Sequence, residues 1–282
     1  NFAGQYIVPQ ATEFIDKYDP DILWYDGEWD TSVKDLQSYE IAAYFYNNAE
    51  GRKEVALNDR LGLSVNDPSY ESLPGPDKDK KRRWHRFVSG DFFTSEYHSH
   101  ANEDLQRHAW EECRGISQSF GYNWQDTDEN VISPKKFIDM FTDIVANGGN
   151  LLLIVNLDEQ GALPKIQETR LKDIGKWLKV NGEGIYNTRP YSVQSDGIVA
   201  YTMSKDGQFL YAILKEWPGN MISLKGINAK PGSRVEMLGY DHSLDWSNTD
   251  ADLNIKLDDN LQDENQRPCK HAWVIKILKV KA

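Results

Sequence analysis

The chain has 282 residues, of which 39% are hydrophobic and 12% aromatic, and its formal net charge is −12. This length and apolar content suffice for one large domain, or for a large and a small one. The negative charge argues against nucleic acid or an anionic membrane surface as a partner, because phosphate groups are bound by clustered Lys and Arg. Cys113 and Cys269 are the two cysteines and lie far apart, so we expect no disulfide framework.

The beginning of the chain combines a helical pattern with a short apolar run. The pattern predicts a helix over Pro9–Tyr18, followed by a buried strand over Ile22–Asp26 that brings Asp26 to its carboxyl end. Trp24 and Trp29 flank this carboxylate, and aromatic faces beside an acid are typical of a sugar site. The alternative is a half-buried strand that ends in a solvated Asp-Gly turn.

The same order of elements then repeats. A helix over Leu36–Asn47 leads to the short apolar run Glu54–Leu57, which ends in the polar residues Asn58–Arg60. After a long loop over residues 62–90, the segment Phe92–Tyr97 again places a carboxylate behind aromatic residues. Functional groups of parallel α/β folds collect at the carboxyl ends of the strands, so these polar residues are candidate site residues.

The remaining chain contains two patterns. Up to about residue 180 we expect a strand-like run at Gly115–Phe120, a helix from Pro134, a fully buried strand at Leu151–Val155 and a helix over Pro164–Lys179. From about residue 190 short alternating runs are separated by turn residues, which is typical of a small antiparallel sandwich. These runs are Val199–Tyr201, Phe209–Leu214, Met221–Leu224, Val235–Leu238, Leu253–Leu257 and Trp273–Val280.

The fold class predicted by these patterns is α/β. Residues 1–188 are expected to form the C-terminal portion of a (β/α)8 barrel, with about the last five strands, and residues 189–282 a β-sandwich domain. A closed barrel of this type needs eight strands. An open half-barrel would expose apolar strand edges, so we expect it not to be stable as a monomer.

Several short motifs, in order along nearly the whole chain, resemble those of the α-L-fucosidases of glycoside hydrolase family twenty-nine. They are Pro20–Gly27, Asn58–Arg60, Ser95–Tyr97, Ser119–Asn123, Gly148–Leu153, Gly175–Leu178 and Asn181–Tyr186. The resemblance implies release of α-L-fucose from fucosylated glycans by a retaining double displacement, with no cofactor and no metal ion. It also implies a fucosylated oligosaccharide or glycoconjugate as the binding partner.

The resemblance assigns roles to five residues. Asp26 matches the nucleophile of the family, and Glu96 matches the general acid/base through a shorter motif. Arg60 matches an arginine that contacts the nucleophile region and the sugar, and Trp24 a wall of the pocket. Phe120 matches a ring near the methyl group of fucose, and an apolar contact suits a 6-deoxy sugar.

Elementary chemistry agrees with the roles of the two acids. Retaining hydrolysis needs two carboxyl groups roughly 5 Å apart, one ionised to attack the anomeric carbon and one protonated to assist the leaving oxygen. A guanidinium beside Asp26 would keep that carboxylate ionised. The aromatic setting of Phe92, Phe93 and Tyr97 would keep the proton on Glu96.

Other assignments stay open at this point. Glu28, Glu111 and Glu112 compete for the acid role, although Glu28 is too near Asp26 in sequence to face it easily across a sugar ring. Arg60 has the alternative of a purely structural ion pair, and Phe120 that of a core residue. Four histidines surround the second carboxylate without a regular ligand spacing, so we interpret them as loop residues rather than a metal site: His85, His98, His100 and His108.

The sequence also departs from the family pattern. Nothing matches the strand-end histidine and the His-His pair that bind fucose hydroxyls in the family, and the first three βα units have no counterpart. We expect association with an N-terminal fragment, homo-oligomerisation that closes the barrel, or a glycan-binding role without hydrolysis. Scavenging of fucosylated glycans would suit a secreted, periplasmic or lysosomal location.

Overall fold

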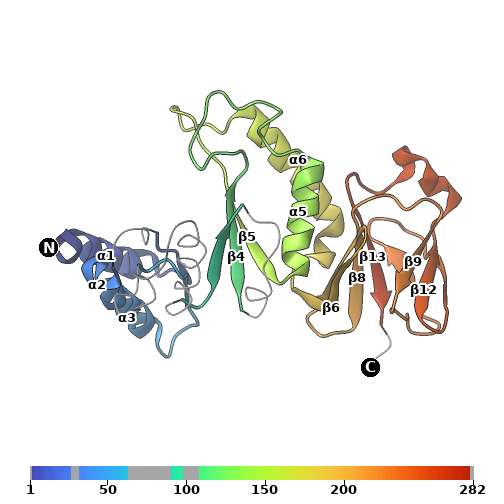
Figure 1. Ribbon diagram of the computed structural model, residues 1–282, viewed down its shortest axis with the longest axis horizontal. Helices are drawn as coiled ribbons and strands as arrows, with labels where there is room; N and C mark the ends of the chain where they lie inside the picture. Colours follow the sequence, from blue (N-terminus) through green and yellow to red (C-terminus); the bar gives the residue numbers. More distant parts are fainter. Residues whose placement is uncertain (1, 27–31, 63–89, 98–107, 280–282) are drawn as a thin grey trace, which may run out of the picture. The chain divides into compact units, whose positions relative to one another are not determined.

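The computed structural model describes residues 2–26, 32–62, 90–97 and 108–279 (Figure 1). The chain divides into two compact units. The first contains residues 1–95 and 103–111, and the second contains residues 96–102 and 112–282. The predicted domain boundary at residues 188 and 189 stays a prediction. None of the helices in the described ranges is long and apolar enough to cross a membrane.

The first unit consists of short helices beside a pair of very short strands. These elements are η1 (Ala3–Ile7), α1 (Val8–Tyr18), β1 (Ile22–Leu23), α2 (Val33–Leu36), α3 (Ser38–Ala49) and β2 (Ala56–Leu57). The first predicted helix is confirmed as α1, with Pro9 in its first turn, where a missing N–H costs nothing. Its buried Ile15 packs against Ile41 and Phe45 of α3, so the two helices share one apolar cluster.

The second predicted helix is in fact two helices. The Ser32 side chain accepts a hydrogen bond from the backbone N–H of Asp35 and caps α2, and Gln37 then adopts a left-handed backbone with φ of 54°. A left-handed residue cannot continue a right-handed helix, so the chain turns at Gln37 before α3 begins. The prediction placed Leu36 inside one continuous helix, which was wrong.

The strand that leads to Asp26 is shorter than predicted. β1 and β2 pair in parallel through Ile22 with Ala56 and Leu23 with Leu57, and regular pairing stops there. Beyond it the side-chain amide of Asn58 replaces the ladder, because its Oδ1 accepts from the Tyr25 N–H and its Nδ2 donates to the Tyr25 carbonyl, both at 2.8 Å. Asn58 therefore holds the backbone of Tyr25, the residue before Asp26, beyond the end of the strand pairing.

Three longer strands form the second sheet of the barrel portion. They are β3 (Phe93–Glu96), β4 (Trp110–Gly115) and β5 (Gly149–Ile154), in the order β3-β4-β5. The run predicted at Gly115–Phe120 is wrong in its bounds, because β4 ends where that run was expected to begin. The N–H of Ile116 donates to the carbonyl of Ile154 at 2.9 Å, which brings the carboxyl ends of β4 and β5 together.

The strand predicted as fully buried is only half-buried. In β5 the residues from Leu151 to Ile154 are all partly exposed. β5 is an outer strand in the order β3-β4-β5, so one of its edges has no strand beside it among the described residues. In total, five strands precede the sandwich in the described ranges, as predicted.

Two long helices follow β4 and β5. They are α5 (Pro134–Ala146), capped by the Ser133 side chain, and α6 (Lys165–Asn181), which leads into the 3-10 turn η4 (Gly182–Gly184). The predicted apolar face of α6 is confirmed at Ile174, but its most buried residues also include Gln167 and Trp177. The Trp177 indole N–H donates to the carbonyl of Ala272 at 2.8 Å and so ties α6 to the end of the chain.

The C-terminal part is an antiparallel sandwich, as predicted. The larger sheet has the order β10-β13-β8-β7-β6 and the smaller sheet the order β11-β12-β9. β6 and β11 were not predicted. The strands are β6 (Thr188–Asp196), β7 (Val199–Ser204), β8 (Phe209–Leu214), β9 (Met221–Lys225), β10 (Val235–Met237), β11 (Asp245–Asn248), β12 (Asp252–Lys256) and β13 (Trp273–Leu278), with the 3-10 turns η5 (Asp259–Gln262) and η6 (Glu264–Gln266) before β13.

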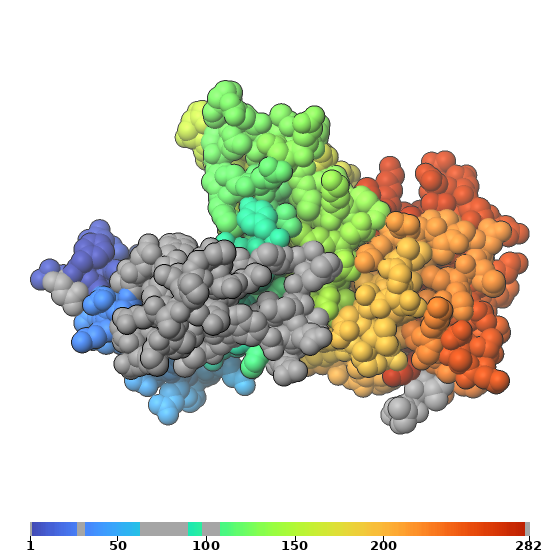
Figure 2. Space-filling model, in the orientation of Figure 1, coloured from blue at the N-terminus to red at the C-terminus, as the bar shows by residue number. Residues whose placement is uncertain are grey.

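The larger sheet is covered on both faces. One face packs against the smaller sheet through a core that includes Leu210, Leu224 and Ile275. The other face carries Tyr211 and Ile213, which are also buried. The turn η4 packs on this face. Its Gly184 lies so close that a Cβ added to it would be 3.5 Å from the Cβ of Tyr211. The helix α5 also contacts this sheet, at β6 and β7 (Figure 1). In the space-filling view, the green region that contains α5 adjoins the yellow and orange region of the sandwich (Figure 2).

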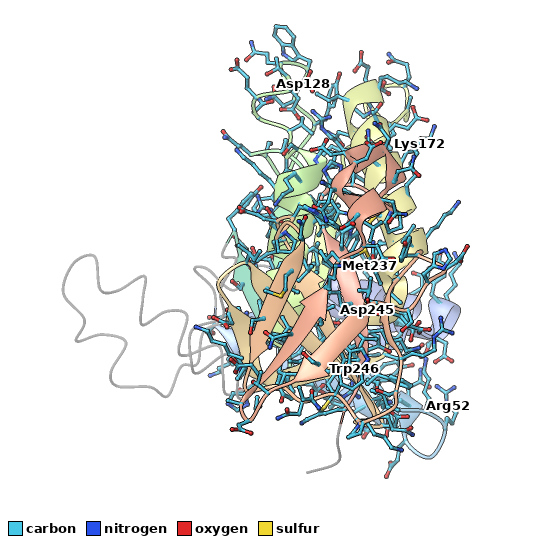
Figure 3. The ribbon with its side chains drawn as sticks, turned by 90° about the vertical axis from the view of Figure 1, so that its right-hand side faces the viewer. Arg52, Asp128, Lys172, Met237, Asp245 and Trp246 are labelled. Atoms are coloured by element: carbon cyan, nitrogen blue, oxygen red, sulfur yellow. The ribbon has the colours of Figure 1, made fainter. Side chains whose placement is uncertain are left out.

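This two-sided burial explains why β8 is apolar at every position. A strand with one face in water would alternate polar and apolar residues, whereas β8 reads Phe-Leu-Tyr-Ala-Ile-Leu. In the view of Figure 3, the smaller sheet lies toward the viewer, with Asp245 and Trp246 labelled on β11 and the buried Met237 on β10.

The packing of the core predicts that substitutions at two residues of β9 have very different effects on the free energy of unfolding. Leu224 is 1% exposed and Met221 is 62% exposed. Leu224→Ala should lower the free energy of unfolding by about 2–5 kcal/mol, because it removes buried methyl groups and leaves a cavity, and Met221→Ala by less than about 0.5 kcal/mol. Urea denaturation of the two variants measures both values. Equal losses would contradict the packing of the smaller sheet described above.

Candidate active site

Arg60 is the centre of the polar group at the ends of β1, β2 and β3. Its side chain is 1% exposed, and its Nη1 lies 3.2 Å from Oδ1 of Asp26, which is half-exposed. Its Nε donates to Oγ1 of Thr94 at 2.8 Å, and that hydroxyl donates in turn to Oδ1 of Asp59 at 2.7 Å. The guanidinium is thus held from the buried side while it presents Nη1 to Asp26.

Trp24 covers the same guanidinium. The centre of the Arg60 guanidinium lies 4.8 Å from the centroid of the Trp24 ring, an arrangement in which a cation is attracted to the aromatic face. The indole N–H of Trp24 donates to Oε1 of Glu111 at 2.8 Å. Arg60 at the face and Glu111 at the edge together fix the orientation of the indole next to Asp26.

Glu111 has an altered acidity. Burial raises the pKa of its carboxyl above the usual value, and the nearby negative charge of Asp59 acts in the same direction. The hydrogen bond from Trp24 and the charge of Arg60 oppose this shift without cancelling it. Glu111 therefore keeps a proton to higher pH than an exposed glutamate does.

The second unit holds the other predicted site residues. Glu96 ends β3, and the next residue, Tyr97, has a left-handed backbone with φ of 54°. The Tyr97 hydroxyl accepts from the N–H of Gly115 at 3.2 Å, and its ring meets that of Phe120 edge-on with centroids 5.1 Å apart. Phe120 is 43% exposed, so it is not a core residue.

The structure thus brings the predicted site residues together in two groups. Asp26, Arg60 and Trp24 are in mutual contact through Arg60 in the first unit, and Phe120 lies against the residue after Glu96 in the second. The separation of the Asp26 and Glu96 carboxyl groups, and the catalytic role of each residue, stay predictions.

The competing acids and the histidines have different fates. Glu28, His85, His98 and His100 lie outside the described residues. Glu112 is fully buried, whereas the neighbouring Glu111 contacts Trp24. The ring of His108 lies 4.7 Å from that of Phe93. Within the described ranges no group of three or more His, Cys, Asp or Glu side chains could hold a metal ion.

Three residues have supporting roles that the sequence analysis did not assign to them. Asn58 holds Tyr25, Thr94 links Arg60 to Asp59, and Tyr97 positions Phe120. Asn58 carried a signal, because a buried amide directly after a strand needs backbone partners. Tyr97 was expected only as part of the aromatic setting of Glu96, and Thr94 carried no signal beyond its position near Glu96.

Comparison with known proteins identifies the family of this chain. The family model for α-L-fucosidase matches residues 1–183, and the model for the α-L-fucosidase C-terminal domain matches residues 194–278. Tissue α-L-fucosidase of Bos taurus is 31% identical over 289 aligned residues, which cover 99% of this chain and 57% of the bovine protein. The chain therefore belongs to the α-L-fucosidase family.

Solved structures show the same relation. The Thermotoga maritima α-fucosidase in complex with a mechanism-based inhibitor is 27% identical, with a TM-score of 0.72 over 99% of this chain and 57% of that one. The same enzyme in complex with fucose is 26% identical, with a TM-score of 0.71 over 98% of this chain and 56% of that one. The chain spans a little over half the length of these relatives.

The shifted acidity of Glu111 predicts a pH dependence of stability. Because the pKa is raised on folding, the folded state binds more protons than the unfolded state between the two pKa values, and stability falls as pH rises through that window. Glu111→Gln keeps an acceptor for the Trp24 N–H but cannot titrate. The free energy of unfolding of the wild type, relative to this variant, should therefore decrease as pH rises through the ordinary pKa of glutamate and up to the raised pKa of Glu111.

Chemical denaturation at a series of pH values measures this difference. Glu13→Gln, on the exposed surface of α1, is the matched control for the loss of one charge. A wild-type advantage that grows with pH would show that Glu111 is stabilised in its ionised form and would contradict the prediction.

Proposed function

We propose that this chain is the C-terminal part of an α-L-fucosidase that releases α-L-fucose from fucosylated oligosaccharides or glycoconjugates by a retaining double displacement. The observation that carries the proposal is the contact of the buried Arg60 guanidinium with the half-exposed Asp26 carboxylate, beside the face of Trp24. Asp26 attacks the anomeric carbon in this mechanism, and Glu96 protonates the leaving oxygen and then activates water.

Each contact of Asp26 suits a nucleophile. The positive charge of Arg60 favours the ionised carboxylate, and the hydrogen bond to Nη1 fixes one oxygen while the exposed side of the carboxylate stays accessible. The Trp24 indole offers an aromatic surface to the apolar face of a pyranose. One relative supports this chemistry, since the Thermotoga maritima α-fucosidase has been solved in complex with fucose and in complex with a mechanism-based inhibitor.

Phe120 suits the recognition of a 6-deoxy sugar. Its exposed ring is steadied by the Tyr97 ring, so an apolar surface is available where other hexoses carry a hydroxyl. We also propose a secreted, periplasmic or lysosomal location, because fucosylated glycans are met there.

Replacement of the two acids tests the mechanism. Hydrolysis of an aryl α-L-fucoside is measured for each variant, made in the full-length protein that contains this chain. Asp26→Gly should abolish turnover, and azide should restore it and give a fucosyl azide of inverted configuration. Glu96→Ala should lower turnover by about 10²–10⁴-fold, as loss of a general acid does.

Two outcomes would change the proposal. If azide rescues only Glu96→Ala with inversion, the roles of the two acids are reversed. If the wild type binds fucosides and turns none over, the chain is a glycan-binding protein.

The position of β5 at the edge of its sheet leads to a proposal about assembly. Its outer edge and half-buried leucines need cover, which we propose comes from an N-terminal segment of the barrel or from another copy of the chain. Residues 1–282 produced alone should therefore elute as an oligomer or an aggregate in size-exclusion chromatography with mass measurement. A stable monomer of 32.4 kDa would contradict this.

A further inference from the structure

A loop between β4 and α5 presents three aromatic side chains to solvent. Phe120 and Tyr122 are each 43% exposed, and Trp124 is 76% exposed. No other large hydrophobic residue in the described ranges is as exposed as Trp124. Contiguous exposed apolar groups are uncommon unless they bind something. The segment of residues 116–132 is called the aromatic loop below.

The aromatic loop is fixed by buried polar residues. The side-chain amide of Asn156, just after β5, donates to the carbonyl of Gly121 at 3.1 Å. The N–H of Asn156 donates in turn to the side chain of Gln167 on α6 at 3.1 Å, and Gln167 is 1% exposed. The exposure of the aromatic rings is therefore a property of a held loop, not of a frayed one.

The far side of the loop is held as firmly. Asn123 makes a turn in which its carbonyl accepts from the N–H of Asp126 and its side-chain amide donates to Oδ1 of Asp126. Asp128 forms an ion pair with Arg170 of α6. Figure 3 labels Asp128 at the same end of this unit as Lys172, which is on α6. Trp124 thus lies between two anchored positions.

The loop begins beside Glu96. The ring of Tyr97 meets that of Phe120, and the Tyr97 hydroxyl is bonded to Gly115 at the end of β4. Trp124 follows Phe120 by four residues, so the chain between them spans at most roughly 13 Å, at up to about 3.4 Å per residue, which leaves room for a further pyranose ring. Exposed aromatic side chains thus follow one another along the chain from Phe120 to Trp124.

We propose that the part of the aromatic loop beyond Phe120 is the binding surface for the sugars that carry the fucose, and that Trp124 stacks on a pyranose beyond the first of them. The proposal rests on the proposed function. A general acid protonates the glycosidic oxygen, so the leaving group must depart on the side of Glu96, where this loop begins. The preferred substrate class is then an α-fucoside on an oligosaccharide of at least two further pyranoses, bound through ring faces.

The test compares two substrates. An aryl α-L-fucoside has a single ring as leaving group and is too short to extend along the loop, whereas a fucosylated oligosaccharide is not. Trp124→Ala should raise KM for the oligosaccharide by roughly tenfold, the loss expected for one aromatic stacking contact, and leave kcat/KM for the aryl fucoside within about twofold. Trp124→Phe should recover most of the loss, because it keeps a ring face.

Two further variants serve as controls. Tyr39→Ala removes an aromatic residue of α3 that is 55% exposed. This variant should leave kcat/KM unchanged for both substrates. Asn156→Asp removes the donor to Gly121 and should raise KM for both substrates, because it loosens the loop beside Phe120 as well as toward Trp124.

The outcomes separate this inference from the proposed function. An equal change of kcat/KM for both substrates in Trp124→Ala would overturn the inference, and so would a lowered melting temperature that Trp124→Phe restores, which would show that Trp124 packs against polypeptide. If the wild type hydrolyses neither substrate, the proposed function fails. Calorimetric binding of the oligosaccharide then decides the inference, supported by weaker binding to Trp124→Ala and overturned by equal binding.

Discussion

The burial of one guanidinium constrains the polar edge of the first unit. An arginine that is 1% exposed has lost its water, so each of its donors needs a partner inside the protein. Thr94 and Asp26 supply oxygen acceptors and Trp24 supplies an aromatic face. Because these partners come from the ends of different strands, satisfying Arg60 also assembles the polar groups at that edge. Loss of the guanidinium would leave them without a common centre.

Polar side chains do much of the work that backbone ladders do in longer sheets. β1 and β2 have only two residues each, yet the chain before Asp26 is held because the Asn58 amide bonds both backbone groups of Tyr25. In the second unit, Gln167 and Asn156 connect α6 to the backbone of Gly121. In both cases a buried amide fixes a segment that has no regular structure of its own, which is how a rigid scaffold can hold functional loops.

The sequence was informative where a local signal determines structure. Ser133 and Pro134 mark the start of α5, and the alternating runs after residue 190 mark the antiparallel sandwich. It was less informative where a distant partner decides. Glu111 meets Trp24 across 87 positions of sequence, and no periodicity reports such a contact. The half-burial of Leu151 to Ile154 in β5 likewise depends on the neighbours of the strand, because these four residues are all apolar.

Because the larger sandwich sheet is buried on both faces, the stability of the C-terminal region depends on the helices α5 and α6 that pack beside it. Lys215, after β8, pairs with Asp143 of α5 at 2.8 Å, and Trp177 of α6 reaches the segment before β13. A cut between these parts would uncover Tyr211 and Ile213 together with the helix surface that shields them. The sandwich therefore does not behave as an independent module. Recombination that exchanged it for an unrelated domain would have to supply a complementary apolar surface for the helices.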